Sequence, residues 1–190
     1  MPYLLFIDDC LAQANDWLLV GIQPPVSPKL YFKEMTEAFD SLEKIFGKKV
    51  VIAGHPNARN DLSYSKNFGG REVYFGITPQ LVQNSYLCLI HCSTATSFAI
   101  LAEKPLISLI SDELLSNSYG NKIRFMSHLL NTTLISISSP IHDLEKNNIL
   151  NVDYQKYLSY KQNFLYGSKC VEARPWQEFL TYQSNKVNGK

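Results

Sequence analysis

The stretch YLCLIHCSTATSFAILAEKPLISLI, residues 86–110, decides the fold of this chain. It contains two apolar runs, Tyr86–Ile90 and Pro105–Ile110, in which apolar and polar residues do not alternate regularly. Short runs of this kind are typical of strands that are buried on both faces of a sheet. The segment between them, Ser93–Glu103, is rich in small residues and is predicted to form a helix. A strand, a helix and a strand in this order indicate two parallel strands joined by a crossover helix.

The same alternation continues in both directions along the chain. The other predicted strands are Tyr3–Ile7, Val50–Ala53, Glu72–Phe75 and Leu134–Ile137. The other predicted helices span residues 28–46, 78–82, 116–130, 154–165 and 175–182, and residues 57–71 are predicted to form a loop. This order predicts an α/β fold, a three-layer Rossmann-like parallel sheet of about six strands with helices on both faces.

The helix predicted over residues 28–46 has clear signals at both ends. Ser27-Pro28 offers a capping hydroxyl followed by a proline in the first turn, and Gly47 is a typical helix terminator. Between them the apolar residues are spaced three and four apart, which is one face of an amphipathic helix. These residues are Phe32, Met35, Phe39, Leu42 and Phe46.

The composition is that of one globular domain, predicted to cover residues 1–190. Apolar residues make up 45% of the chain and charged residues 18%, which excludes a disordered protein. Lys and Arg number 18 against 17 Asp and Glu, so the net charge is +1. A near-neutral chain is not expected to be a general binder of nucleic acids, which need a concentrated positive surface. No apolar run approaches the roughly 20 residues of a membrane span.

The cysteines indicate a reducing compartment. None of the four forms a CxxC pair or a zinc-type spacing with histidine, so neither a metal site nor a disulfide framework is expected. They are Cys10, Cys88, Cys92 and Cys170. The first residues lack the basic segment and cleavage site of a signal peptide. The expected location is the cytoplasm, with the inner face of a bacterial membrane as the alternative.

Polar residues follow several of the predicted strands, at the edge where ligands bind to open parallel sheets. The strongest group is Ser93, Thr94 and Thr96, at the predicted start of a helix directly after a strand. Free backbone N–H groups, the helix dipole and the hydroxyls would together suit a phosphate. The alternative is that these hydroxyls only cap the helix.

A second candidate is His55-Pro56, at the end of the strand Val50–Ala53. The proline restricts the backbone there, so the imidazole would be held at the sheet edge and could donate to a phosphate oxygen or a ribose hydroxyl. The alternative is a structural histidine that is hydrogen-bonded within the fold.

Further polar residues at strand ends or in loops are secondary candidates. They are Asp8, Asp9, Arg59, Arg71, His91 and Asp112. The acids could serve as bases or metal ligands, but no spacing among them requires a metal, and solvated loop acids are the alternative. His91 and Cys92 are adjacent on an extended segment, so their side chains point apart and a catalytic Cys–His pair is not expected. The catalytic residues stay unassigned.

These motifs together resemble the C-terminal, nucleotide-sugar-binding half of a GT-B glycosyltransferase. The resemblance covers about residues 3–137. It rests on the strand that ends in His55-Pro56, on residues 90–99 (IHCSTATSFA) and on residues 103–107 (EKPLI). More narrowly, residues 68–74 (FGGREVY) and 78–85 (TPQLVQNS) look like bacterial surface-carbohydrate biosynthesis proteins.

The resemblance implies that the donor lies between two Rossmann-like domains, with His55, Ser93 and Thr94 at its phosphate. Many GT-B enzymes carry a ribose-binding Glu seven residues before a Gly-x-Pro proline, but this position is Phe98 here and Glu103-Lys104 replaces Gly-x. The His-Pro pair with Ser/Thr is closer to transferases that use CMP-activated acidic sugars. CMP is therefore favoured over UDP or GDP, and no metal or other cofactor is implied.

The function expected from the resemblance is transfer of a sugar from a nucleotide-sugar to a surface polysaccharide or glycolipid. A missing N-terminal domain or partner chain would supply the acceptor site and the base, so this chain alone is expected to be inactive. A homodimer and peripheral membrane association stay open. Two alternatives remain: an enzyme like the nucleotide-sugar 2-epimerases, and a non-catalytic binding or assembly module of the same fold.

Overall fold

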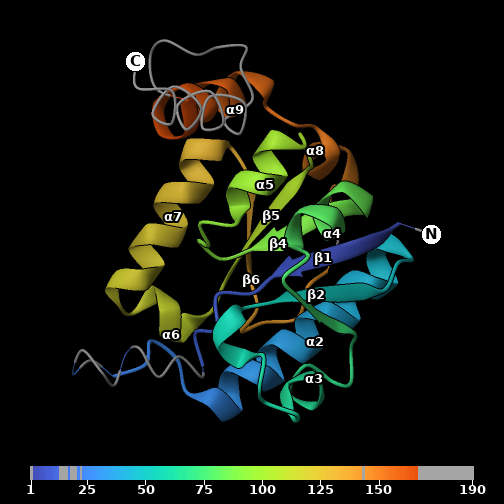
Figure 1. Ribbon diagram of the computed structural model, residues 1–190, viewed down its shortest axis with the longest axis vertical. Helices are drawn as coiled ribbons and strands as arrows, with labels where there is room; N and C mark the ends of the chain where they lie inside the picture. Colours follow the sequence, from blue (N-terminus) through green and yellow to red (C-terminus); the bar gives the residue numbers. More distant parts are fainter. Residues whose placement is uncertain (1, 13–16, 18–20, 22, 143, 167–190) are drawn as a thin grey trace, which may run out of the picture.

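The computed structural model describes residues 2–12, 17, 21, 23–142 and 144–166 of the chain. Its centre is a six-stranded parallel sheet with the strand order β3-β2-β1-β4-β5-β6 (Figure 1). The strands are β1 Tyr3–Ile7, β2 Val50–Gly54, β3 Val73–Phe75, β4 Ser85–Ile90, β5 Leu106–Ile110 and β6 Thr133–Ser136. The predicted fold class, a three-layer Rossmann-like sheet, is confirmed.

Alternate residues of each central strand enter two separate cores, one on either face of the sheet. In β1, Leu4 and Phe6 belong to one core, whereas Leu5 and Ile7 belong to the other. The first core is covered by α2 (Pro28–Phe46), α3 (Tyr64–Asn67) and α8 (Lys146–Leu150), and the second by α4 (Thr78–Asn84), α5 (Thr96–Leu101) and α9 (Tyr154–Tyr160). Burial on both faces explains why the strands read as apolar runs without alternation.

The ends of α2 lie where the sequence predicts them, although Ser27 acts differently from the expected cap. Gly47 adopts the left-handed conformation, with φ of 63°, and its N–H donates to the carbonyl of Glu43. The Ser27 hydroxyl makes no capping bond to the helix. Instead, both its hydroxyl and its backbone N–H donate to the carboxylate of Glu113, which ties the start of α2 to the distant α6 (Asp112–Leu115).

Two of the predicted segments differ from the structure. Residues 57–71, predicted as a loop, contain a 3₁₀ turn (Pro56–Ala58) and the short helix α3. Tyr64 and Phe68 of this region are buried, so it contributes to the core. The helix predicted over residues 116–130 is preceded by α6, and α7 (Ser118–Leu130) begins after Asn117, whose side chain accepts from the N–H of Tyr119.

The C-terminal part of the described chain packs beside α5 and α7. Beyond α9 the chain continues as a π-helical turn over Lys161–Tyr166. The helix predicted over residues 175–182 and Cys170 lie outside the described residues. Among the helices that the structure describes, none is long and apolar enough to cross a membrane.

Candidate functional site

The strand order makes the carboxyl end of β1 a topological switch point, and we call the edge formed by the residues that follow β1, β2 and β4 the crevice. Strand β1 lies between β2 and β4, and the chain moves outward in opposite directions from it (Figure 1). Such a switch point is where open α/β sheets bind their ligands. Asp8 and Asp9 follow β1, His55 follows β2 and His91 follows β4, so the topology brings four of the predicted residues to one edge.

Asp8 connects the end of β1 to the side of β2. Its carboxylate accepts a hydrogen bond from the Tyr64 hydroxyl, one of 2.9 Å from the N–H of Cys10 and one of 3.3 Å from the N–H of His55. The side chain is buried, and this burial raises the pKa of Asp8, although the three donors act in the opposite direction. Because these donors come from the protein, Asp8 holds the crevice wall in place.

Asp9 makes the corresponding connection to the side of β4. Its Oδ2 accepts from the N–H of Cys92 at 3.0 Å and from the Tyr119 hydroxyl at 2.8 Å. Burial and the nearby Asp9 carboxylate raise the pKa of Tyr119, so the phenol stays protonated and donates. The other oxygen, Oδ1, is buried and has no partner within the part of the chain that the structure describes.

His91 lies beneath this edge and has no exposed surface. Its Nδ1 lies 2.8 Å from the Leu109 carbonyl, which can only accept, so the ring proton belongs on Nδ1. Nε2 then accepts from the Tyr31 hydroxyl at 2.9 Å. Burial lowers the pKa of His91, which favours the neutral ring. Both nitrogens are occupied, so His91 serves the core and offers no atom to a ligand.

His55, in contrast, keeps one nitrogen for a ligand. Its Nδ1 accepts the N–H of Asn57 at 3.3 Å, so the proton of the neutral ring belongs on Nε2. Pro56 begins the 3₁₀ turn that fixes this arrangement. Arg59 follows that turn, and its guanidinium lies beside Gly76 just past β3, where an added Cβ would be 3.4 Å from Nη2. An imidazole donor and a cation therefore lie at the carboxyl ends of β2 and β3.

The segment after β4 differs from the predicted helix start. The chain from Ser93 to Phe98 is held first by i to i+3 bonds, such as those from the N–H of Thr96 to the carbonyl of Ser93 and from Ser97 to Thr94. The α-helix begins only at Thr96, with Ala95 as its cap residue, and has six residues. The helix start predicted at Ser93 is therefore corrected by three residues, and the phosphate-binding helix terminus expected there is replaced by a turn.

The three hydroxyls of this turn have different environments. Ser93 Oγ accepts from the N–H of Ala95 at 3.3 Å and keeps its own proton for donation. Thr94 is exposed. Thr96 is fully buried, and its hydroxyl has no partner among the described residues. Ser93 and Thr94 are thus the members of this group that a ligand can reach.

Two of the secondary candidates lie away from the crevice. Arg71 precedes β3 and sits at the opposite, amino edge of the sheet. There its guanidinium forms ion pairs with Asp40 at 2.6 Å and with Glu43 at 3.0 Å, and packs over the ring of Phe39. Asp112 begins α6 directly after β5. In the sheet, β5 is separated from β1 by β4, so Asp112 does not follow one of the strands at the switch point. Its side chain is exposed.

Three tyrosines of the site were not predicted. Tyr31, Tyr64 and Tyr119 come from α2, α3 and α7, and each donates to a polar side chain at the end of β1 or β4. Tyr31 lies one turn before Met35 on the buried face of α2, and that spacing is the signal that could have identified it. The other two hydroxyls reach their partners only through the tertiary fold.

The described residues provide no group of metal ligands, and burial raises the pKa of two of their thiols. Within the described ranges, no three His, Cys, Asp or Glu side chains are grouped so as to hold a metal ion. Burial raises the pKa of Cys92, and it raises the pKa of Cys88 to about 11. Thiols with raised pKa values are weak nucleophiles at neutral pH.

No protein-family model matches this sequence, and a search of curated proteins found no significant match.

Proposed function

We propose that this chain is the nucleotide-sugar-binding half of a bacterial glycosyltransferase, with the nucleotide lying across the carboxyl ends of β1, β2 and β4. The observation that carries the proposal is the strand order, because its switch point lies between the strands followed by His55 and Ser93. Neighbouring strands are about 4.8 Å apart, so these two ends flank β1 at a separation of about 10 Å. That span suits the phosphate of a nucleotide with its sugar on one side and its nucleoside on the other.

The available donors define how the phosphate would be held. His55 offers Nε2–H, Ser93 offers its hydroxyl proton and Arg59 offers a guanidinium. These groups would stabilise the charge that develops on the phosphate when the bond to the anomeric carbon breaks. The proposal requires no metal for this step. CMP remains favoured over UDP and GDP on the sequence motifs.

The buried network behind the donors supports a preorganised site. Asp8 and Asp9 fix the end of β1 to both neighbouring strand ends, so the donors are attached to a rigid edge. Most of the carboxylate oxygens accept from protein donors, which directs their charge away from the crevice. Oδ1 of Asp9 is buried behind this edge, so the contacts to a nucleotide are left to His55, Ser93 and Arg59.

The same network favours one alternative, a non-catalytic binding module. Asp8 and His91 make their hydrogen bonds inside the protein, so neither of these two side chains is free to act as a base. In the proposed enzyme, the base and acceptor site come from a second domain or a partner chain. A second Rossmann-like half in the full-length protein would favour the enzyme over the module, because it would supply the base and the acceptor site.

The test of the proposal is a binding experiment on the chain with CMP, UDP and GDP, by NMR titration of backbone amides. One nucleotide is expected to shift the amides that follow β1, β2 and β4. Both His55→Ala and Ser93→Ala should weaken binding, with about tenfold expected for a charge-assisted bond. The controls are His128→Ala and Ser41→Ala, which lie on α7 and α2. No shifts up to 10 mM nucleotide, or equal losses in the control variants, would overturn it.

A further inference from the structure

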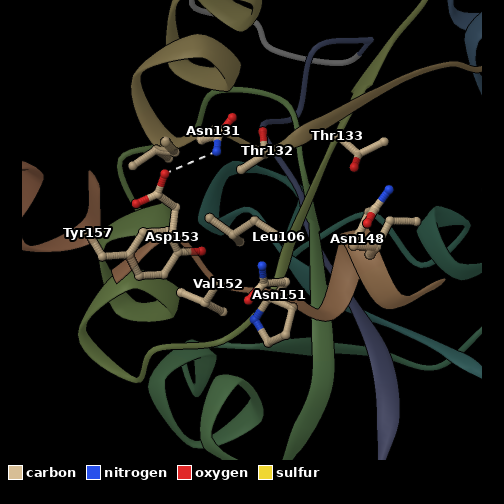
Figure 2. Close-up of a pocket in the computed structure, with 12 residues that line it drawn as sticks. Leu106, Asn131, Thr132, Thr133, Asn148, Asn151, Val152, Asp153 and Tyr157 are labelled. Carbon is tan, nitrogen blue, oxygen red and sulfur yellow. Dashed lines mark hydrogen bonds between the residues drawn. The ribbon is translucent and has the colours of Figure 1, made fainter. Parts of the chain in front are cut away.

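A second polar site lies on the opposite edge of the sheet, at the amino ends of β5 and β6. Figure 2 shows it between the end of α7 and the segments of α8 and α9. It opens into a groove of about 630 Å³, a volume within the range of about 300–1,000 Å³ that is usual for small-molecule sites. The groove is lined by Asn131, Thr132, Thr133, Asn148, Asn151, Val152, Asp153, Tyr154 and Gln155.

The lining combines neutral polar groups with an apolar floor. Amides and hydroxyls form the rim, whereas Val152 lies between them in Figure 2 and Leu106 is buried beneath. The ring of Tyr154 borders the groove, and this residue is 58% exposed. Asp153 contributes the single carboxylate, and no lysine or arginine is among the described residues that line the groove.

Part of the rim is held in place by internal hydrogen bonds. The Asn131 amide donates to Asp153 at 3.0 Å, as the dashed line in Figure 2 shows, and the other oxygen of Asp153 accepts from the N–H of Lys156. The Thr132 hydroxyl bonds to Ser127 at 3.2 Å. These contacts fix the wall of the groove formed by the end of α7.

Two other side chains on the rim have hydrogen-bonding capacity to spare. Asn151 and Thr133 make no side-chain hydrogen bond within the described part of the chain, and they line the same groove. An amide donates through its nitrogen and accepts through its oxygen, and a hydroxyl does both through one atom. A ligand hydroxyl is also both donor and acceptor, so it can pair with either group.

The chemistry of the groove selects a class of ligand. The Asp153 carboxylate and the lack of lining cations disfavour an anion. A wholly apolar ligand would bury the amides without partners, at a cost of about 1–3 kcal/mol for each group. A neutral sugar has hydroxyls for the rim and C–H faces for Val152 and Tyr154.

We propose that this groove binds a neutral segment of a glycan chain, one or two sugar units in length. The site is distinct from the crevice, because a strand of five residues separates the two edges by about 17 Å. The idea that the groove binds the growing polysaccharide product rests on the proposed function. The binding of a neutral saccharide rests only on the residues that line the groove. A polymer anchored here would remain near the enzyme between transfer steps.

The test uses ¹⁵N-labelled chain, because side-chain amides of asparagine give separate NMR signals. The probes are maltotetraose, cellotetraose and chitotetraose as neutral saccharides, tetragalacturonate as an anionic one and tetraglycine as a peptide. At least one neutral tetrasaccharide should shift the amide signals of Asn131, Asn148 and Asn151. Asn151→Ala and Thr133→Val should each weaken its binding about fivefold, as expected for loss of one hydrogen bond. Asn121→Ala, an exposed change on α7, should leave it unchanged.

Three outcomes would overturn the proposal. They are the absence of shifts with every neutral tetrasaccharide at 20 mM, stronger binding of tetragalacturonate or tetraglycine, and an affinity unaffected by both groove substitutions. A CMP titration of the same sample separates this proposal from the previous one. Saccharide binding without nucleotide binding would leave the groove standing and remove the donor site, and the reverse result would remove only the groove.

Discussion

The Tyr31 hydroxyl lies 2.9 Å from Nε2 of His91, and this contact joins α2 to the end of β4 through the interior. His91 continues the connection to β5, because its Nδ1–H donates to the carbonyl of Leu109 at 2.8 Å. The ring also meets Phe6 of β1 edge-on, with centroids 5.5 Å apart. One buried imidazole therefore links a helix and three strands beneath the crevice.

The Tyr31→Phe substitution tests the first half of this link. It removes the hydroxyl and leaves Nε2 of His91 buried without a donor, so the free energy of unfolding should fall by about 1–3 kcal/mol. The measurement is urea unfolding followed by circular dichroism. Tyr86→Phe is the matched control, because the contacts of Tyr86 with Phe46 and Lys48 involve its ring, and it should change stability by less than about 0.5 kcal/mol. Equal effects of the two substitutions would contradict the role given to the Tyr31 hydroxyl.

The pH dependence of stability should report the buried state of His91. Burial lowers the pKa of His91 below 6.5, although Asp9, the Leu109 carbonyl and Asp8 act in the opposite direction. Between the lowered pKa and 6.5 the unfolded chain binds more protons than the folded chain. The contribution of the neutral His91 ring to the free energy of unfolding is therefore complete above pH 6.5. It is lost as the pH falls from 6.5 through the lowered pKa.

The direct measurement is an NMR titration of the histidine ring signals. The His91 signals should not yet titrate at pH 6.5, and His91→Gln should remove this contribution from the difference in stability between pH 7.5 and 5.5. Asp8 acts in the opposite direction, because burial raises its pKa above 3.8 and its protonation favours the folded state. Comparison of wild type with His91→Gln cancels the Asp8 contribution. A His91 ring that titrates at or above pH 6.5 would show that it is not buried as described.

Gly120 should not tolerate alanine, although alanine is normally favoured in a helix. A Cβ at Gly120 of α7 would lie 2.1 Å from the carbonyl oxygen of Leu114 and 3.0 Å from Cα of Leu115, both in the backbone of α6. Gly→Ala within a helix usually adds about 1 kcal/mol of stability. Here it should remove about 1–3 kcal/mol, because α6 must move. Thermal and urea unfolding would measure the change, with Asn121→Ala as control; a more stable Gly120→Ala protein would refute the contact.

The strands could be predicted because their apolar sequences match their burial on both faces of the sheet. Burial on both faces makes Tyr3–Ile7 and Leu106–Ile110 apolar runs, and the helices between the strands follow from the parallel topology. Residues 57–71 could not be predicted in the same way. The helix α3 has four residues, too few to establish a helical period. It is held by tertiary contacts of its neighbours. The ring centroid of Phe68, which follows α3, lies 5.1 Å from that of Phe32 in α2.

That the candidate residues share one edge of the sheet was also predictable, whereas their hydrogen bonds were not. Residues that follow parallel strands must reach the same edge, which brings Asp8, His55 and Ser93 together. The tyrosine partners come from helices far away in the sequence, and no local pattern marks them. Ser93 and Thr94 are good cap residues, but a turn of i to i+3 bonds precedes the helix, which begins only at the fully buried Thr96.

Arg59 provides the most specific test of where a nucleotide phosphate binds. Its guanidinium lies beside Gly76 at the carboxyl edge, so Arg59→Ala should weaken CMP binding about three- to tenfold at low salt. The loss should shrink with added salt, because the screening length falls from about 30 Å at 0.01 M to about 8 Å at 0.15 M. Cytidine, which lacks the phosphate, should bind both proteins equally. Arg124→Ala, at an exposed position on α7, is the matched control. If Arg59→Ala weakens cytidine as much as CMP, the guanidinium does not face the phosphate, and if it weakens neither, the nucleotide lies elsewhere along this edge.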